Sequence, residues 1–304
     1  MFYAVFVLFL IFSFASADSF PPPFYRALDV QQPLLSGNDV TILQNLLGRA
    51  VNVTVTGVFD AATSTALAQF QSLHYLSPNG GALDPLTATV LLQTLSNDGY
   101  VEDGVPAAAL GYLYKIVIHV HSNRSIEHVG HLHDANNALL LSFIARAHGY
   151  DCDCPTPWPH YNATSCGLSQ FATNGNTPTG LMELDLNTPE PNATEFGPYN
   201  VNRAVKGLRG NAAFLLPNIR NGILVHTGEW PGWKPPGEMP NSAGCVHSWP
   251  EGIKDIAEVL KGLGVVARPN PGGVLPYPYK PQGLLSVWQD AGDDCLSLPP
   301  KPVV

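Results

Sequence analysis

Residues 225–247 read VHTGEWPGWKPPGEMPNSAGCVH, and this stretch organises the second half of the chain. The apolar run of residues 223–225 is short enough for a buried strand, and it ends at His226. A loop rich in Pro, Gly and Trp then leads to Gly244 and Cys245. The sequence therefore predicts a histidine at a strand end and a cysteine on a loop that returns toward it.

His226 and Cys245 are the residue types of a nucleophilic site. A thiol with its free pKa of about 8.5 is only slightly ionised at neutral pH, and a neighbouring imidazole is the usual group that activates it. The small residues before Cys245 let backbone N–H groups approach a bound carbonyl closely. We interpret Cys245 as the attacking group and His226 as its general base. The alternative is a cysteine that only fills buried apolar space.

The spacing of these residues resembles the signature of the L,D-transpeptidase catalytic-domain family. That signature is a His, about fifteen residues, Ser or Thr, usually a second His, and then Gly-Cys; here the intervening residues are 227–241. The resemblance implies that Cys245 accepts an acyl group and that His226 takes its proton. It also implies that the backbone carbonyl of Thr227 or Gly228 orients the imidazole, and that no metal or other cofactor is needed.

Two positions depart from the family pattern. Ala243 replaces the second His, and His247 stands where the family usually has Arg or Asn. We expect Ser242, Gly244 and His247 to serve oxyanion binding or substrate positioning, with the N–H groups of Gly244 and Cys245 at the oxyanion. The departures leave two alternatives open. One is a catalytically silent peptidoglycan-binding protein, and the other is a secreted structural or interaction protein on the same fold.

Residues 36–95 contain an internal repeat. The segment GVFDAAT at residues 57–63 recurs as GALDPLT at residues 81–87. Each Asp is a predicted helix N-cap, and Pro85 suits the first helical position. With an earlier helix up to residue 47, the pattern resembles the small three-helix peptidoglycan-binding domain found beside many wall-acting enzymes.

The predicted fold class is multidomain α+β, with the all-α domain followed by a mainly-β transpeptidase-like sandwich or partly open barrel over residues 112–268. Short apolar runs between turn residues indicate strands, among them residues 114–121 and 138–147. Residues 177–180, TPTG, are typical of the transpeptidase family, where they precede a strand near the active site.

Three further segments frame this domain. Residues 248–251 have the Ser-x-x-Glu form of a capping box and are followed by apolar residues at helical spacing, which predicts a helix behind Cys245. Residues 101–110 read as a linker. Residues 269–304 are Pro-rich and are expected to form a tail strapped over the surface.

Residues 1–17 combine an apolar run with a small-x-small cleavage pattern, which predicts a signal peptide. No later stretch approaches the roughly 20 apolar residues of a membrane span, so we expect a secreted, extracellular or cell-envelope protein without stable membrane insertion. The formal net charge of −9 argues against nucleic acid as a partner. The expected partner is peptidoglycan or its peptide fragments, and the sequence does not distinguish cross-linking from hydrolysis.

The remaining cysteines and the Asn-x-Ser/Thr sequons fit an exported chain. If Cys245 is catalytic, four cysteines remain, and we expect Cys152 and Cys154 each to pair with one of Cys166 and Cys295. The candidate glycosylation sites are Asn52, Asn123, Asn162 and Asn192. Histidines crowd residues 119–133, and we expect surface or packed side chains there in preference to a zinc site.

Overall fold

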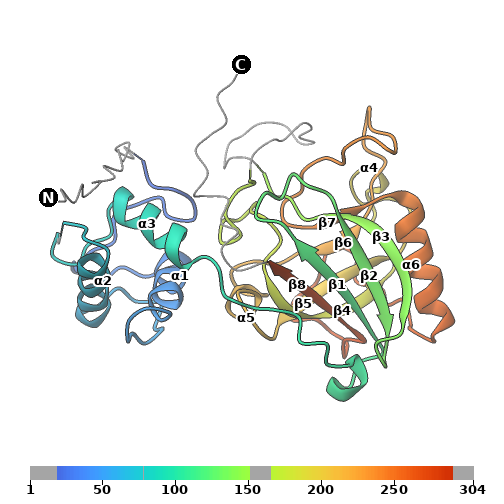
Figure 1. Ribbon diagram of the computed structural model, residues 1–304, viewed down its shortest axis with the longest axis horizontal. Coiled ribbons are helices and arrows are strands. Elements are labelled where there is room, and N and C mark those ends of the chain that lie inside the picture. The colour runs from blue at the N-terminus through green and yellow to red at the C-terminus, as the bar shows by residue number, and fades with distance from the viewer. Residues whose placement is uncertain (1–18, 78, 151–165, 290–304) are drawn as a thin grey trace, which may run out of the picture.

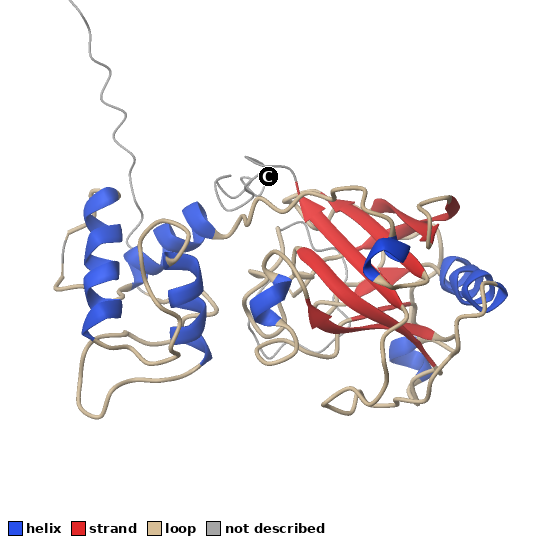
Figure 2. Ribbon diagram, turned by 90° about the horizontal axis from the view of Figure 1, so that it is seen from below, coloured by secondary structure: helices blue, strands red, loops and turns tan. Residues whose placement is uncertain are grey.

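The computed structural model describes residues 19–77, 79–150 and 166–289, and Figure 1 shows a helical domain beside a β-barrel. The helical domain contains α1 (Asn38–Leu47), α2 (Ala61–Leu73) and α3 (Pro85–Leu95). Figure 2 shows the same division from below, with these helices gathered on one side and the strands on the other. The predicted signal peptide lies outside the described residues.

The repeat in the sequence becomes a repeated way of starting a helix. The Asp60 carboxylate accepts the Thr63 N–H at 2.8 Å, and the Asp84 carboxylate accepts the Thr87 N–H at 2.7 Å. These are the predicted N-caps of α2 and α3, and Pro85 occupies the first position of α3. The three-helix prediction is confirmed.

Two buried glutamines also follow the repeat, because each bonds to the first turn of the next helix. Gln44 Nε2 donates to the Thr63 hydroxyl at 2.8 Å and to Val58 O at 2.9 Å. Gln71 Nε2 donates to the Thr87 hydroxyl at 3.1 Å and to Ala82 O at 2.9 Å. Each glutamine thus ties one helix to the beginning of the next through its Nε2 group, whereas the buried Gln71 Oε1 has no partner among the described residues.

The second domain is a closed barrel of eight strands in the order β1-β2-β3-β7-β6-β5-β4-β8. Neighbours are antiparallel except for β1 with β8 and β6 with β7, which are parallel. The strands are β1 (Tyr114–Val120), β2 (His128–Asp134), β3 (Leu139–Arg146), β4 (Gly180–Asn187), β5 (Val201–Gly207), β6 (Leu224–His226), β7 (Val246–Ser248) and β8 (Gly283–Gln289). The mainly-β prediction is confirmed as a barrel; the sandwich alternative is wrong.

The interior of the barrel follows the alternation of β1. Tyr114, Ile116 and Ile118 are fully buried and stand two residues apart, as one face of a strand requires. Tyr114 also donates its hydroxyl proton to Asn202 Oδ1 on β5 at 2.8 Å. The strand predicted at residues 114–121 therefore supplies a central part of the barrel core.

The expectation that residues 269–304 form a surface tail is wrong for residues 283–289. Residues 283–289 form β8, which pairs with β1 on one side and β4 on the other and closes the barrel. Its apolar run LLSVW fills a place between two strands, and Leu284, Leu285 and Val287 are fully buried. The barrel therefore continues past residue 268. The predicted linker likewise contains a short 3-10 helix, η1 (Ala107–Leu110).

The helix expected behind Cys245 is present as α6 (Pro250–Gly262), which packs against β3 along the side of the barrel (Figure 1). Ile253, Ile256 and Leu260 are fully buried, and burial of such side chains contributes ~1.5–3 kcal/mol each. The predicted capping box at residues 248–251 does not form. Trp249 is the N-cap residue without a side-chain cap, the Ser248 hydroxyl has no partner among the described residues, and Pro250 begins the helix instead.

The residues directly after α3, which precede the predicted linker, tie the helical domain to the barrel. The Asp98 carboxylate accepts the Asn211 N–H at 2.5 Å and the Thr179 hydroxyl at 2.9 Å. Arg49 of the helical domain donates to the Asn211 side chain, which lies just before α5 (Ala212–Leu215).

Among the described residues, no helix is both long enough and apolar enough to cross a membrane.

We predict that β8 is essential for the stability of the barrel. Leu285→Ala should lower the free energy of unfolding by about 2–5 kcal/mol, because it empties a fully buried site. Urea denaturation followed by fluorescence measures this change. Leu275→Ala is the control, since Leu275 is 45% exposed and should lose less than about 1 kcal/mol. Equal losses in both variants would contradict the role of β8.

Candidate active site

β6 and β7 bring the predicted histidine and cysteine together. His226 ends β6, Cys245 directly precedes β7, and the two parallel strands place His226 beside His247. A cavity of about 440 Å³ opens at this point. Its lining comes from five segments of the barrel domain: Tyr150, Thr173, Asn174, Glu195, Phe196, Asn221, Gly222, His226, Ser242, Ala243, Cys245 and His247.

The His226 imidazole is fixed by its own backbone neighbour. His226 Nδ1 lies 2.6 Å from Thr227 O, one of the two carbonyls expected there, whereas the other candidate, Gly228, is not the partner. Phe196 packs near the ring at a centroid distance of 5.2 Å. Because Nδ1 donates to a carbonyl, Nε2 is the nitrogen left to accept a proton. Burial lowers the pKa of His226 to about 4, so the imidazole is neutral at pH 7.

Cys245 carries a free thiol that is 8% exposed. Its Sγ accepts the Leu224 N–H at 3.4 Å and donates to Gly222 O at 3.5 Å. Burial raises the pKa of the thiol to about 11, although the nearby charges of Arg203 and Arg220 oppose the rise. No hydrogen bond joins Sγ to His226 in the described part of the chain. The resting pair is thus a neutral thiol and a neutral imidazole that share one cavity.

The residues before Cys245 form a tight turn, and this corrects one expectation. The Gly244 N–H donates to Ser242 Oγ at 3.0 Å, so it is not available to an oxyanion. The Ser242 hydroxyl lies 2.8 Å from Cys245 O and 3.0 Å from His148 O, so it holds the turn. The Cys245 N–H has no hydrogen-bond partner among the described residues. Of the two donors expected at the oxyanion, only Cys245 remains.

Arg220 is a buried positioning residue that the sequence analysis missed. Its guanidinium donates to Gln170 O at 2.5 Å, Gly175 O at 3.0 Å and Ala243 O at 3.1 Å. Gly244 has φ +109°, and a Cβ there would lie 2.0 Å from Arg220 Nη2. Burial lowers the pKa of Arg220 to about 10, which still leaves it charged at neutral pH. Arg220 thus joins the turn before Cys245 to the segment 170–176.

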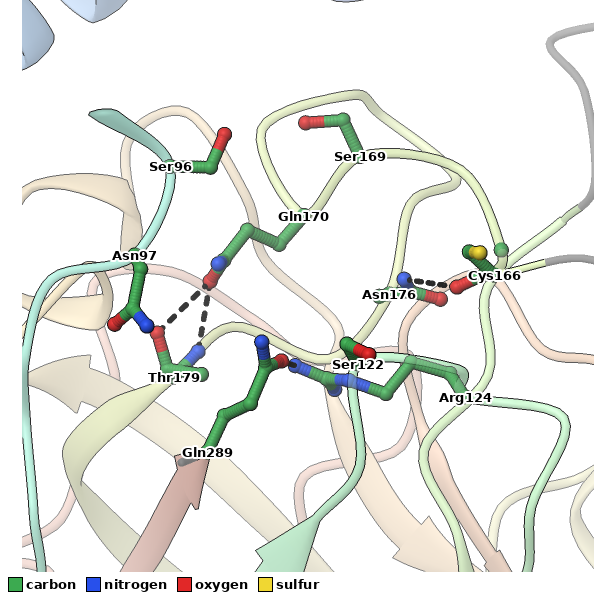
Figure 3. Close-up of a pocket in the computed structure, with 11 residues that line it drawn as sticks. Ser96, Asn97, Ser122, Arg124, Cys166, Ser169, Gln170, Asn176, Thr179 and Gln289 are labelled. Carbon is green, nitrogen blue, oxygen red and sulfur yellow. Dashed lines mark hydrogen bonds between the residues drawn. The ribbon is translucent and has the colours of Figure 1, made fainter. Parts of the chain in front are cut away.

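The TPTG segment, residues 177–180, also contacts the backbone at Cys245. The Thr177 hydroxyl donates to Cys245 O at 3.3 Å, and Gly180 begins β4, so the segment precedes a strand near Cys245, as expected. Figure 3 shows Gln170 directed at Thr179, whose N–H and hydroxyl lie 2.8 and 3.2 Å from Gln170 Oε1. These bonds connect the segment to the residues that Arg220 holds.

His247 lines the cavity beside His226. Its Nδ1 lies 2.8 Å from Pro240 O, and its ring packs against those of Trp230 and His226 at centroid distances of 4.5 and 4.8 Å. Burial, assisted by neighbouring His226, holds the pKa of His247 well below its usual range. The buried Arg146 anchors the same loop through Glu238 at 2.7 Å. His247 is therefore neutral and held by two parts of the long loop.

Several predicted sites lie apart from this cavity. Cys166 is disulfide-bonded, but its predicted partners Cys152, Cys154 and Cys295 lie outside the described residues, and the pairing stays a prediction. Asn162 also lies outside them. Asn52 and Asn192 are exposed and Asn123 is partly exposed, while glycosylation itself stays a prediction.

The clustered histidines make ordinary contacts. His119 stacks on Trp288 at 3.7 Å, His128 Nε2 accepts the His121 N–H at 3.0 Å, and the ring of His131 meets the Ser142 hydroxyl at 3.0 Å. His133 Nδ1 lies 3.2 Å from Asn137 O. Within the described ranges, no group of three or more His, Cys, Asp or Glu is placed to hold a metal ion.

The helical domain has a recognisable family. Residues 36–91 match the family described as "Putative peptidoglycan binding domain", which confirms the resemblance of residues 36–95. A search of curated proteins found no match for the chain.

Solved structures resemble the chain only distantly. An L,D-transpeptidase from Xylanimonas cellulosilytica is 16% identical over 83% of this chain and 94% of its own, with a TM-score of 0.26. An L,D-transpeptidase from Stackebrandtia nassauensis is 12% identical over 87% and 97%, with a TM-score of 0.29. A fused zinc-dependent amidase/peptidase/peptidoglycan-binding domain-containing protein from Clostridium acetobutylicum is 13% identical over 86% and 99%, with a TM-score of 0.24. Similarity at this level supports no conclusion about chemistry.

We predict that Cys245 reacts as a buried neutral thiol. Because burial raises its pKa to about 11, alkylation by iodoacetamide should be slow at pH 7 and should rise about tenfold per pH unit between pH 7 and 10. Mass spectrometry of the Cys245 peptide measures the rate. A rate that is already constant between pH 6 and 8 would contradict this prediction, since it would indicate a preformed thiolate–imidazolium pair.

We also predict that Gly244 has no tolerated substitute. Gly244→Ala should lower the free energy of unfolding by about 2 kcal/mol or more. Residue 244 has a positive φ, and the added Cβ would lie very close to the Arg220 guanidinium. Gly232→Ala is the matched control: Gly232 has φ +78° but nothing within 4 Å of the added Cβ, so only the backbone cost of about 1 kcal/mol applies. Chemical denaturation compares the two. An Ala at 244 that costs no more than the control would refute the close approach.

Proposed function

We propose that this chain is an exported cysteine acyltransferase of the L,D-transpeptidase type that acts on peptidoglycan stem peptides. The observation that carries this proposal is the shared cavity. Cys245 Sγ and the His226 ring both line it, and Thr227 O fixes His226 so that Nε2 is the free nitrogen. This is the arrangement of a nucleophile with an oriented general base.

The reaction would proceed in two acyl transfers. Cys245 Sγ attacks the acyl carbonyl of a stem peptide while its proton passes to His226 Nε2, and the Cys245 N–H is the donor placed to bind the oxyanion. The amine leaves with the proton from His226, and a thioester remains on Cys245. An acceptor amine then attacks the thioester and gives a cross-link, whereas water gives hydrolysis; either step restores the thiol.

Sγ has to turn before the first step. In the resting site it is held between the Leu224 N–H and Gly222 O. Sulfur is a weak hydrogen-bond donor and acceptor, so both contacts cost little to break and rotation about the Cys245 side chain is a small motion. A neutral base suits this chemistry, because the low pKa of His226 keeps its Nε2 unprotonated down to about pH 4.

The helical domain favours a polymeric substrate. A second cavity of about 260 Å³ lies between α1 and the barrel, with Tyr25 and Asn38 on one side and Phe171 on the other. Thr173 lines both this cavity and the one at Cys245. A wall strand that contacts the helical domain would thereby lie next to the thiol that receives its stem peptide.

Three features of the site at Cys245 support a second function. Sγ makes no hydrogen bond to His226 among the described residues, and its pKa is raised to about 11, which also suits a protein that binds wall fragments without chemistry. The replacement of the usual second His by Ala243 points the same way. The helical domain serves both functions equally, so only the fate of Cys245 separates them.

The expected outcome for an acyltransferase is one covalent adduct. Intact-mass spectrometry of the folded chain with a stem-peptide donor or a carbapenem should show a single acyl group on wild type and none on Cys245→Ala. His226→Ala should slow acylation by about 10²-fold or more, because it removes the base. His247→Ala should slow it less, since His247 only packs against the base.

The controls decide between the two functions. Each variant is first checked for an unchanged circular dichroism spectrum and for sedimentation with purified wall. Folded wild type that sediments with wall but forms no adduct with several donors across pH 6–10 would establish the silent binding protein instead.

A further inference from the structure

Among the described residues that line the Cys245 cavity, one side chain is charged at neutral pH. Of the residues that line it, His226 and His247 have pKa values lowered by burial and the Cys245 thiol has a raised pKa, so all three are neutral. The other lining groups are uncharged except for the Glu195 carboxylate. Among these lining residues the half-buried Glu195 is thus the one acid, while the charges of Arg203 and Arg220 act on Cys245 from outside the lining.

Glu195 is held in place by its backbone. It belongs to the short helix α4 (Ala193–Phe196), whose Ala193 O accepts the Glu229 N–H at 3.1 Å. Glu195 O accepts the Trp230 indole N–H at 3.2 Å. These two bonds fasten α4 to the loop that follows His226.

Two glycines allow this close contact. A Cβ at Gly228 would lie 2.2 Å from the Trp230 indole nitrogen and 2.7 Å from Glu195 O. A Cβ at Gly197 would lie 2.5 Å from the Thr227 side chain. The backbone of α4 therefore sits directly against the residues that fix the catalytic base, and Glu195 has a defined position at the cavity.

The Glu195 carboxylate has no cationic partner among the described residues. Within this part of the chain it accepts one hydrogen bond, from Asn192 Nδ2 at 3.3 Å, and no Lys or Arg forms an ion pair with it. Desolvation raises its pKa, and its charge in turn raises the pKa of Cys245 and of Tyr150, which places it electrically within reach of both. A half-buried carboxylate without a counter-ion is stabilised when a cation enters the cavity.

We propose that Glu195 binds an ammonium group of the substrate and so makes the Cys245 cavity selective for amine-bearing ligands. This inference rests on the proposed acyl transfer for its biological meaning. The ammonium can belong to a side chain of the acyl donor or to the acceptor that later attacks the thioester. In both cases the recognition chemistry is the same, a charge-assisted hydrogen bond from N–H to the Glu195 carboxylate.

Charged thiol reagents test the inference without acyl transfer. The 2-aminoethyl and 2-sulfonatoethyl methanethiosulfonates each form a mixed disulfide with Cys245 and release methanesulfinate, but they carry opposite charges. After division by their rates with a free thiol, the cationic reagent should react about tenfold faster than the anionic one. Glu195→Gln should reduce this ratio about fivefold or more, because the attracting charge is gone.

Glu229→Gln is the matched control, since it removes an equal charge from the neighbouring loop but Glu229 is exposed and does not line the cavity. It should leave the ratio within about twofold of wild type. A ratio that Glu195→Gln does not change, or that both variants change equally, would overturn the inference.

Single-turnover acylation then identifies the source of the ammonium. If the donor carries it, Glu195→Gln should slow acylation by a free-amine stem peptide but not by the same peptide with that amine acetylated. If the acceptor carries it, the variant should slow only the loss of the thioester to an added amine. Acylation and thioester loss that are both unaffected would refute substrate recognition by Glu195.

The two proposals fail separately. A charge ratio that depends on Glu195 in a chain that forms no acyl adduct would refute the acyltransferase alone. An acyl adduct in a chain without charge selectivity would refute the ammonium site alone.

Discussion

The site depends on the buried guanidinium of Arg220. It supplies N–H donors to Gln170 O, Gly175 O and Ala243 O, three carbonyls that no strand or helix pairs. A buried charge is tolerable only when its donors are satisfied, and here the loops satisfy them. In return, Arg220 fixes the turn that carries Cys245, and only a glycine at position 244 leaves room for it. Loops that would otherwise be mobile thus become a defined wall of the cavity.

The second constraint is the burial of His226 and Cys245. Burial keeps both groups neutral, with the imidazole pKa lowered and the thiol pKa raised. In the proposed acyl transfer, a neutral pair would transfer its proton during the attack, which makes the fixed direction of His226 Nε2 important. Thr227 O provides that direction, and the parallel pairing of β6 with β7 holds the two strand ends side by side. Among the described residues that line the cavity, Glu195 then supplies the one charged side chain.

The local parts of this arrangement are predictable from sequence, and the non-local parts are not. The caps at Asp60 and Asp84 and the strand end at His226 depend on residues a few positions away, so their patterns can be read directly. β8 could not be placed, because the choice between an inner strand and a surface tail depends on β1 and β4, which lie far away in the sequence. Arg220 and Glu195 carry no motif, and their roles follow from carbonyls and a cavity that exist only after folding. Gly244 was expected to let its N–H approach a bound carbonyl, whereas in the structure the nearby Arg220 is what requires glycine and the N–H donates to Ser242.

A crystal structure of the chain after reaction with a stem-peptide donor tests the central claim most directly. The proposed acyl transfer predicts a thioester at Cys245, with Sγ turned away from Gly222 O, the acyl oxygen within about 3 Å of the Cys245 N–H and His226 Nε2 facing the position of the departed amine. The Nδ1 contact of His226 with Thr227 O should be unchanged. An unmodified Cys245 with the peptide bound elsewhere, or a thioester whose oxygen points away from the Cys245 N–H toward solvent, would contradict the account.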